Sequence, residues 1–142
     1  DGTSNLSVSL PAAGSYVFAV DGSNPAARRL TVESSPVEVF VRGINGDWSD
    51  GVQNRMSYLG FGTYRIDRAV AAGATGFKIA SGDWSTVNCG GPAGASDSVA
   101  LGQPYALACG DGTSNLSVTA PVDGTYRFKY TRSDSGLLVT GP

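Results

Sequence analysis

Short runs in which apolar and polar residues alternate dominate this chain of 142 residues. The clearest run spans residues 125–131, where every second residue is aromatic, namely Tyr126, Phe128 and Tyr130. Successive side chains of a β-strand point to opposite faces, so these three predict an inward stripe, and the basic residues between them should face water. The period of two therefore predicts a strand with one buried face.

Similar runs recur along the chain and predict further strands. They are expected at residues 37–42, 55–59, 63–68, 77–80, 98–101, 105–108, 115–119 and 137–140, with a hairpin turn at Gly60-Phe61-Gly62. No stretch of helix length is amphipathic, and Gly, Ser and Thr are frequent. Antiparallel strands with one wet face pack as two sheets, so we predict an all-β fold, an antiparallel β-sandwich.

An internal repeat determines how the chain divides into domains. Residues 1–8 and 111–118 both read DGTSNLSV. The match continues with Pro11, Gly14, Tyr16 and Phe18 against Pro121, Gly124, Tyr126 and Phe128, and closes with Leu30-Thr31-Val32 against Leu138-Val139-Thr140. A period of about 110 residues suits one small β domain in a tandem array. We therefore predict that residues 1–35 are the C-terminal hairpin of a preceding copy, and that residues 36–142 form a complete module.

The N-terminal hairpin carries an apolar stripe without a core of its own. Tyr16, Phe18 and Val20 alternate with other residues, and an isolated hairpin of this kind is marginally stable and has open edges. We therefore expect the stripe to be buried. Either copy of the hairpin could complete the core formed by residues 36–110, and we favour pairing of residues 1–35 with a second chain, as a homodimer, over packing within one chain.

The only two tryptophans of the chain lie in two copies of the quartet GDWS, at residues 46–49 and 82–85. Gly and Asp are turn residues, so both indoles are predicted at turns. Each quartet follows a strand whose outward residue is a cation, Arg42 or Lys78. An exposed Trp84 would offer an apolar plate for the CH face of a sugar, and Lys78 would donate to its hydroxyls. Alternatively, Trp84 fills the end of the core and Lys78 is a solvated charge.

The two cysteines, Cys89 and Cys109, flank a segment rich in Gly, Pro and Ser. The chain has no His and no CxxC spacing, so a metal site is not expected, whereas secreted β domains of low charge commonly pair their cysteines. We predict a disulfide and a secreted protein. Such a bond would stabilise the fold by about 3 kcal/mol. Two buried free thiols are the alternative.

Charge and hydropathy exclude several functions. The formal net charge is −2 with Lys and Arg scattered, so no nucleic-acid groove is expected. The apolar runs are too short to span a membrane, and no signal segment opens the chain, so it should be a piece of a larger mature protein. Asp111 in DGTSN could be a calcium ligand, but it is a single acid and calcium binds six to eight oxygen ligands, so the signal for a calcium site is weak. We expect no metal and no cofactor.

Three segments carry a resemblance to a known family. The order VFVRGINGDWS, GTYRIDRAVAAG and FKIASGDWSTVNCG resembles the starch-binding modules attached to pullulanases and related outer-surface starch-utilisation proteins, over residues 36–142. The resemblance implies an immunoglobulin-like β-sandwich that binds α-glucans without catalysis and is fused to an amylase or pullulanase, often in tandem. It also implies that Trp48 and Trp84 stack on sugar rings while Lys78 and Asn88 make polar contacts. The cysteine pair is not a hallmark of that family.

Two other classes of function compete with this interpretation. Asp47 and Asp83 could be the paired carboxylates of a glycoside hydrolase, which must face each other across a cleft. Each is instead expected to be the polar member of a tight turn, and a β domain of this size has little room for a deep cleft. The second alternative is a structural spacer or adhesin-like repeat of a surface protein, in which both tryptophans are buried.

Overall fold

The computed structural model describes residues 7–13, 16–34 and 36–142. Its strands are β1 (Tyr16–Asp21), β2 (Arg29–Ser34), β3 (Phe40–Arg42), β4 (Ser57–Gly60), β5 (Thr63–Val70), β6 (Gly73–Ala80), β7 (Asn88–Gly90), β8 (Asp97–Val99), β9 (Pro104–Ala106), β10 (Ala108–Cys109), β11 (Leu116–Ala120), β12 (Gly124–Thr131) and β13 (Gly136–Thr140). Single 3-10 turns lie at Ile44–Gly46 and Val52–Asn54. Among the described residues, no helix has the length and apolar character needed to cross a membrane.

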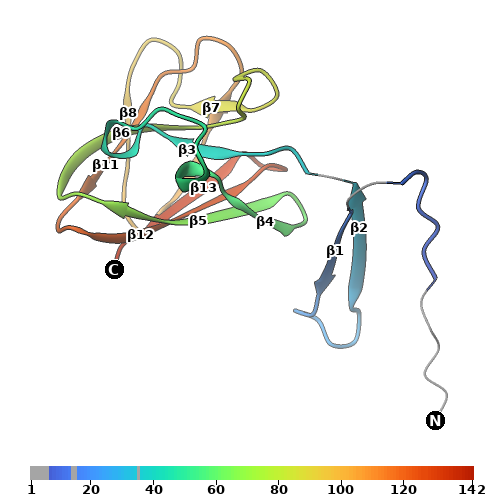
Figure 1. Ribbon diagram of the computed structural model, residues 1–142. Coiled ribbons are helices and arrows are strands. Elements are labelled where there is room, and N and C mark those ends of the chain that lie inside the picture. The colour runs from blue at the N-terminus through green and yellow to red at the C-terminus, as the bar shows by residue number, and fades with distance from the viewer. Residues whose placement is uncertain (1–6, 14–15, 35) are drawn as a thin grey trace.

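The strands from β3 onward form two sheets that pack against each other (Figure 1). One sheet has the order β10-β7-β6-β11-β8, with β3 also paired to β6, and the other has the order β4-β5-β12-β13-β9. The pairs are antiparallel except for β11 and β8, which run parallel. The predicted all-β sandwich is confirmed.

The core lies between these two sheets and is centred on β12. Each of Tyr126, Phe128 and Tyr130 exposes at most 2% of its surface, as the alternation predicts. Phe77 on β6 meets Phe128 from the opposite sheet, with ring centroids 5.4 Å apart in an edge-to-face arrangement. Such a pair adds about 0.5–1.5 kcal/mol beyond the burial of its area. The Gly60-Phe61-Gly62 segment turns between β4 and β5 as predicted.

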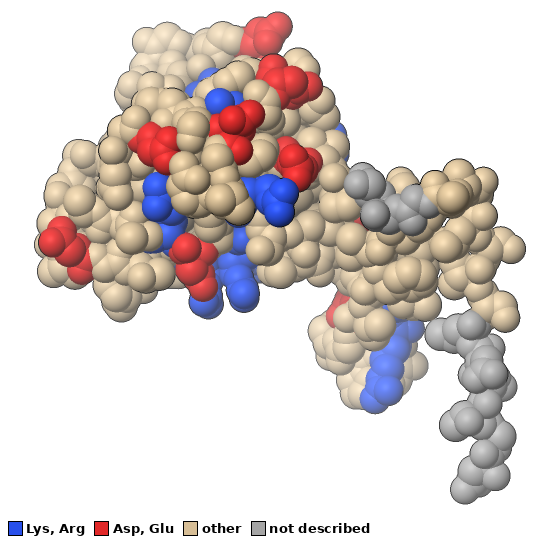
Figure 2. Space-filling model, viewed as in Figure 1, with Lys and Arg blue, Asp and Glu red and all other residues tan. Residues whose placement is uncertain are grey.

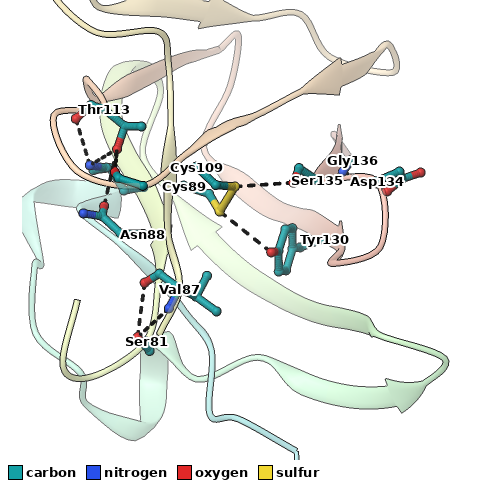
Figure 3. The surroundings of a disulfide bond; sticks show 12 residues. Ser81, Val87, Asn88, Cys89, Cys109, Thr113, Tyr130, Asp134, Ser135 and Gly136 are labelled. Atoms are coloured by element: carbon teal, nitrogen blue, oxygen red, sulfur yellow. Dashed lines mark hydrogen bonds between the residues drawn. A yellow bond between two sulfur atoms is a disulfide. The ribbon is translucent and has the colours of Figure 1, made fainter. Parts of the chain in front are cut away.

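Two short strands could not be predicted from the sequence because their residues do not alternate between apolar and polar. β7 reads NCG and β10 reads AC, and they pair in the register Cys109 to Cys89. The two cysteines form the predicted disulfide, and the described chain contains no free thiol, so the alternative of two buried thiols is wrong (Figure 3). The Sγ of Cys89 faces the Tyr130 hydroxyl at 3.8 Å, so the bond joins β10 to the edge of the core.

β1 and β2 form a separate two-stranded sheet beside the sandwich (Figure 1). Its register pairs Phe18 with Val32, as the register of β12 and β13 pairs Phe128 with Val139. Val32 therefore corresponds to Val139. The alignment of the repeat is corrected by one residue, so that Leu30-Thr31-Val32 matches residues 137–139.

The hairpin touches the sandwich by the face opposite to its stripe of Tyr16, Phe18 and Val20. Ala19 is buried against Gly60 at the end of β4, and a Cβ atom on Gly60 would clash with the Cβ of Ala19. Phe18 and Val20 are 57% and 67% exposed. The expectation that the stripe of Tyr16, Phe18 and Val20 is buried is thus not met within a single chain, because the smaller Ala19 side makes the contact instead.

Candidate functional site

The two GDWS loops meet over the outer side of the β3–β6 pair. Arg42 on β3 lies directly opposite Lys78 on β6, and each tryptophan follows its cation by six residues. Because the strands are antiparallel, the loops leave from opposite ends of the pair and return towards each other. The ring centroids of Trp48 and Trp84 are 6.5 Å apart and the ring planes are tilted by 31°. Two turns far apart in sequence thereby form one aromatic surface.

Both indoles reach solvent, and they do so unequally. Trp48 is 37% exposed, whereas Trp84 is partly buried. The benzo edge of Trp48 lies on Gly43, where a Cβ atom would come within 2.7 Å of Cζ2. Gly43 also has a φ of 107°, a conformation that favours glycine. The Trp48 ring therefore rests where only glycine fits beneath it.

Trp84 has a left-handed backbone conformation, with a φ of 59°. This conformation is uncommon for a bulky residue and is held here by its own turn. The Asp83 carboxylate accepts hydrogen bonds from the Ser85 hydroxyl at 2.7 Å, from the Thr86 hydroxyl at 3.0 Å and from the Ser81 hydroxyl. These hydrogen bonds, the one from Ser81 foremost, hold the pKa of Asp83 far below its usual range. An ionised aspartate thus stabilises the turn that presents Trp84.

Asp47 has the equivalent role in the first loop. Its carboxylate accepts hydrogen bonds from the Gln53 amide at 2.8 Å and from the Ser49 hydroxyl at 2.7 Å, and Arg68 lies 3.6 Å away. The Gln53 and Ser49 bonds hold the pKa of Asp47 far below its usual range. Glycoside hydrolysis needs one acid whose pKa is raised so that it keeps a proton. With both pKa values lowered, Asp47 and Asp83 do not fit that role.

Lys78 corrects one of our expectations. Its side chain does point away from Phe77 and Ile79, but it is only 7% exposed and so is not a free ammonium on an outer face. Its Nζ donates to the Thr113 carbonyl at 2.9 Å and to the Thr113 hydroxyl at 2.7 Å, and lies 6.0 Å from the centre of the Trp84 ring. Burial lowers the pKa of Lys78. The loops that carry Trp84 and Thr113 cover this side of β6, which strand alternation alone does not reveal.

Asn88 is the first residue of β7 and follows the Trp84 loop in the chain. Its Oδ1 is 3.5 Å from the Thr113 hydroxyl, and its side chain points towards Thr113 and away from Tyr130 (Figure 3). The backbone carbonyl of Asn88 accepts a hydrogen bond from the Gly110 N–H at 2.9 Å. The structure thus brings Asn88 and Lys78 together through Thr113, on the Trp84 side of the aromatic surface.

Sequence reasoning missed two residues of this site. The sequence identified Arg42 only as the outward cation before the first quartet, yet it is 7% exposed and its guanidinium carbon lies 4.1 Å from the centre of the Trp84 ring. Thr113 lies in the repeated DGTSN segment and gave no signal as the partner of Lys78. The available clue for Arg42 was that each cation precedes its tryptophan by six residues. This equal spacing predicts that Arg42 and Lys78 lie at similar distances from their own GDWS loops.

Comparison with known proteins gives one structural match of interest. No protein-family model matches the chain, and no curated protein matches it. The chain is similar to a solved structure described as "Ligand induced structure of AmyP-SBD", with a TM-score of 0.56 and 23% sequence identity, over 99% of this chain and 97% of that chain. At this identity, the likeness supports the fold.

Proposed function

We propose that this chain is a non-catalytic carbohydrate-binding module that binds starch-type α-glucan on the surface formed by Trp48 and Trp84. The observation that carries the proposal is the meeting of the chain's only two tryptophans as a tilted pair, in which Trp48 is exposed and Trp84 is partly buried. Sugar rings present flat CH faces that pack on indoles. Two such plates within 6.5 Å suit neighbouring units of one chain. The matched structure supports the proposal, since SBD in its description denotes a starch-binding domain.

The tilt between the rings favours an α-glucan over a flat β-glucan. Successive units of an α-1,4 chain turn relative to one another, so the chain curves, whereas a cellulose-like chain stays flat. Ring planes inclined by 31° follow a curved ligand better than a flat one. A hollow of about 450 Å³ beside Trp48, next to Ala72 and Thr75, gives the chain room to continue.

On the Trp84 side, polar contacts would come from Asn88 and from the small part of Lys78 that stays accessible, since that side chain is 7% exposed. Lys78 keeps one N–H after its two bonds to Thr113, and an amide such as Asn88 can both donate and accept. Figure 2 shows acidic and basic side chains interspersed over one face of the molecule, and the formal net charge is only −2, so neither points to a charged ligand. Stacking on the two indoles would supply most of the affinity, and Lys78 and Asn88 would orient the sugar.

The module would act outside the cell, where the Cys89–Cys109 disulfide is stable, and would hold an attached amylase or pullulanase on its substrate. We also propose the tandem arrangement: residues 1–35 belong to a preceding copy and residues 36–142 form one module. The shared register of β1–β2 and β12–β13 supports this division. The alternative, a structural spacer, needs no exposed indoles.

Affinity electrophoresis tests the function directly. In native gels, soluble amylopectin should retard the wild-type chain strongly, while hydroxyethyl cellulose at the same concentration should leave its mobility unchanged. Retardation by neither polymer would favour the spacer, and equal retardation by both would remove the preference for α-glucans.

We further propose that the hairpin face of Phe18, Val20, Leu30 and Val32 pairs with the same face of a second chain. Phe18 and Val20 are more than half exposed, whereas their counterparts Phe128 and Tyr130 are fully buried. An apolar face of this kind is self-complementary about a two-fold axis. A homodimer would thus bury what a single chain leaves in water.

Deletion of residues 1–35 should convert that dimer into a folded monomer in sedimentation velocity at matched concentration. The double change Phe18→Ser and Val20→Ser should do the same in the full-length chain, because it removes the apolar face without shortening the protein. Val122→Ser is the control and should leave the dimer intact, because this 53% exposed residue lies in the turn between β11 and β12, outside the hairpin. A full-length chain that sediments as a monomer at every concentration would contradict the proposal.

A further inference from the structure

We propose that Arg42 is the positioning residue of the aromatic surface: its single guanidinium fixes where the two tryptophans lie relative to each other. The inference deepens the proposed function and rests on it for its effect on binding. It stands on hydrogen bonds from Arg42 to both loops and on its stacking with one of the rings.

Arg42 bonds to the backbone of both GDWS loops. Its Nε donates to the carbonyl of Trp48 at 2.7 Å, and its Nη1 donates to the carbonyls of Ser81 and Gly82, each at 3.3 Å. Ser81 and Gly82 open the turn that carries Trp84. A guanidinium is planar and rigid, with donors in a fixed fork, so it holds these carbonyls in one mutual arrangement.

The same guanidinium also supports the Trp84 ring from one side. Its central carbon lies 4.1 Å from the ring centroid, within the range of a favourable cation–π contact. One face of Trp84 is therefore covered by Arg42, and a sugar can stack only on the other. Arg42 thus selects the face that Trp84 presents as well as its position.

The surroundings of Arg42 are unfavourable for a residue with a purely packing role. Lys78 lies directly opposite it on β6, and each side chain is only 7% exposed. Like charges directly opposite on paired strands destabilise a sheet, and burial of a charge carries a desolvation penalty. An apolar side chain would avoid both penalties but could not bond to the two loops. The penalties of burying Arg42 are offset by its hydrogen bonds to the two loops and its contact with the Trp84 ring, which are the contacts that hold the tryptophans in place.

Circular dichroism can test the arrangement separately from binding. Trp48 and Trp84 are the only indoles in the chain, and at 6.5 Å their transitions should couple and give an exciton couplet. The change Trp84→Phe removes the coupling and sets the zero level. Arg42→Lys keeps the charge but loses the fork, so the couplet should fall to less than about half, and the Kd for maltoheptaose should rise roughly tenfold, as for one lost stacking contact. Arg127→Lys, at an exposed residue paired with Asp67 on the opposite sheet, is the matched control and should change neither.

An Arg42→Lys variant that is folded and keeps the wild-type couplet and Kd would overturn the proposal. A purely structural role would lower Tm and leave the couplet intact below it. If Arg42→Lys does not fold, Arg42→Gln takes its place, and failure of both to fold would also overturn the proposal by making Arg42 a residue of the folding core. If the wild-type chain shows the couplet but does not bind maltoheptaose, the proposed function is wrong, and the loss of the couplet still decides the role of Arg42.

Discussion

Trp84→Ala is expected to remove most of the affinity for α-glucan while the β-sandwich stays folded. Trp84 presents to the ligand the one ring face that Arg42 does not cover, so stacking there should be worth the lower end of the value for full burial of such a side chain, about 1.5 kcal/mol. Kd should therefore rise roughly tenfold. Isothermal titration with maltoheptaose measures the change.

The fold should tolerate this substitution because Trp84 is at a loop and not in the core. Its removal gives up a cation–π contact with Arg42 and, in exchange, lets water reach Arg42 and Lys78. Leu59→Ala, at a residue 46% exposed on β4, is a control that should leave both Kd and fold unchanged. An unfolded Trp84→Ala chain would show that the indole fills the core. A folded variant with unchanged Kd would show that sugar binds elsewhere.

Removal of the disulfide should have the largest effect on stability. The double variant Cys89→Ala and Cys109→Ala releases a loop whose ends are 20 residues apart, and the chain-entropy model gives a loss of about 3 kcal/mol in the free energy of unfolding. For a domain of this size, Tm should fall by roughly 10 °C. The bond fixes β10, and the segment that follows β10 holds Thr113, the partner of Lys78.

Urea denaturation of the oxidised wild type, the reduced and alkylated wild type, and the double variant measures this loss. The last two should agree with each other and fall below the first. If all three unfold at the same denaturant concentration, the disulfide does not contribute to the stability of the native state.

The strands could be predicted from sequence wherever one face is buried. The stripe of Tyr126, Phe128 and Tyr130 gave β12 and the inward direction of its side chains, because alternation follows directly from strand geometry. β7 and β10 could not be predicted in this way, since they hold two or three residues each and depend on the register of Cys89 with Cys109. These two strands form because distant segments of the chain pair with each other, and the local sequence pattern does not reveal that pairing.

The candidate site was predictable in its aromatic residues and not in its cations. The GDWS repeat places both indoles at turns, since Gly and Asp fix the local backbone. For Lys78 and Arg42, alternation gives only the side of the strand, and this side is covered by loops that come back from elsewhere in the chain. Whether an outward charge is solvated depends on that covering, which only the tertiary structure supplies.

The central claim is that α-glucan lies on the two indoles, and tryptophan fluorescence reports on it directly because Trp48 and Trp84 are the only sources of indole emission. Titration of the wild-type chain with maltoheptaose should give a saturable shift in emission whose midpoint agrees with the calorimetric Kd, and cellohexaose should give none. Calorimetric binding of maltoheptaose without any change in emission would contradict the account, since it would place the glucan away from both tryptophans.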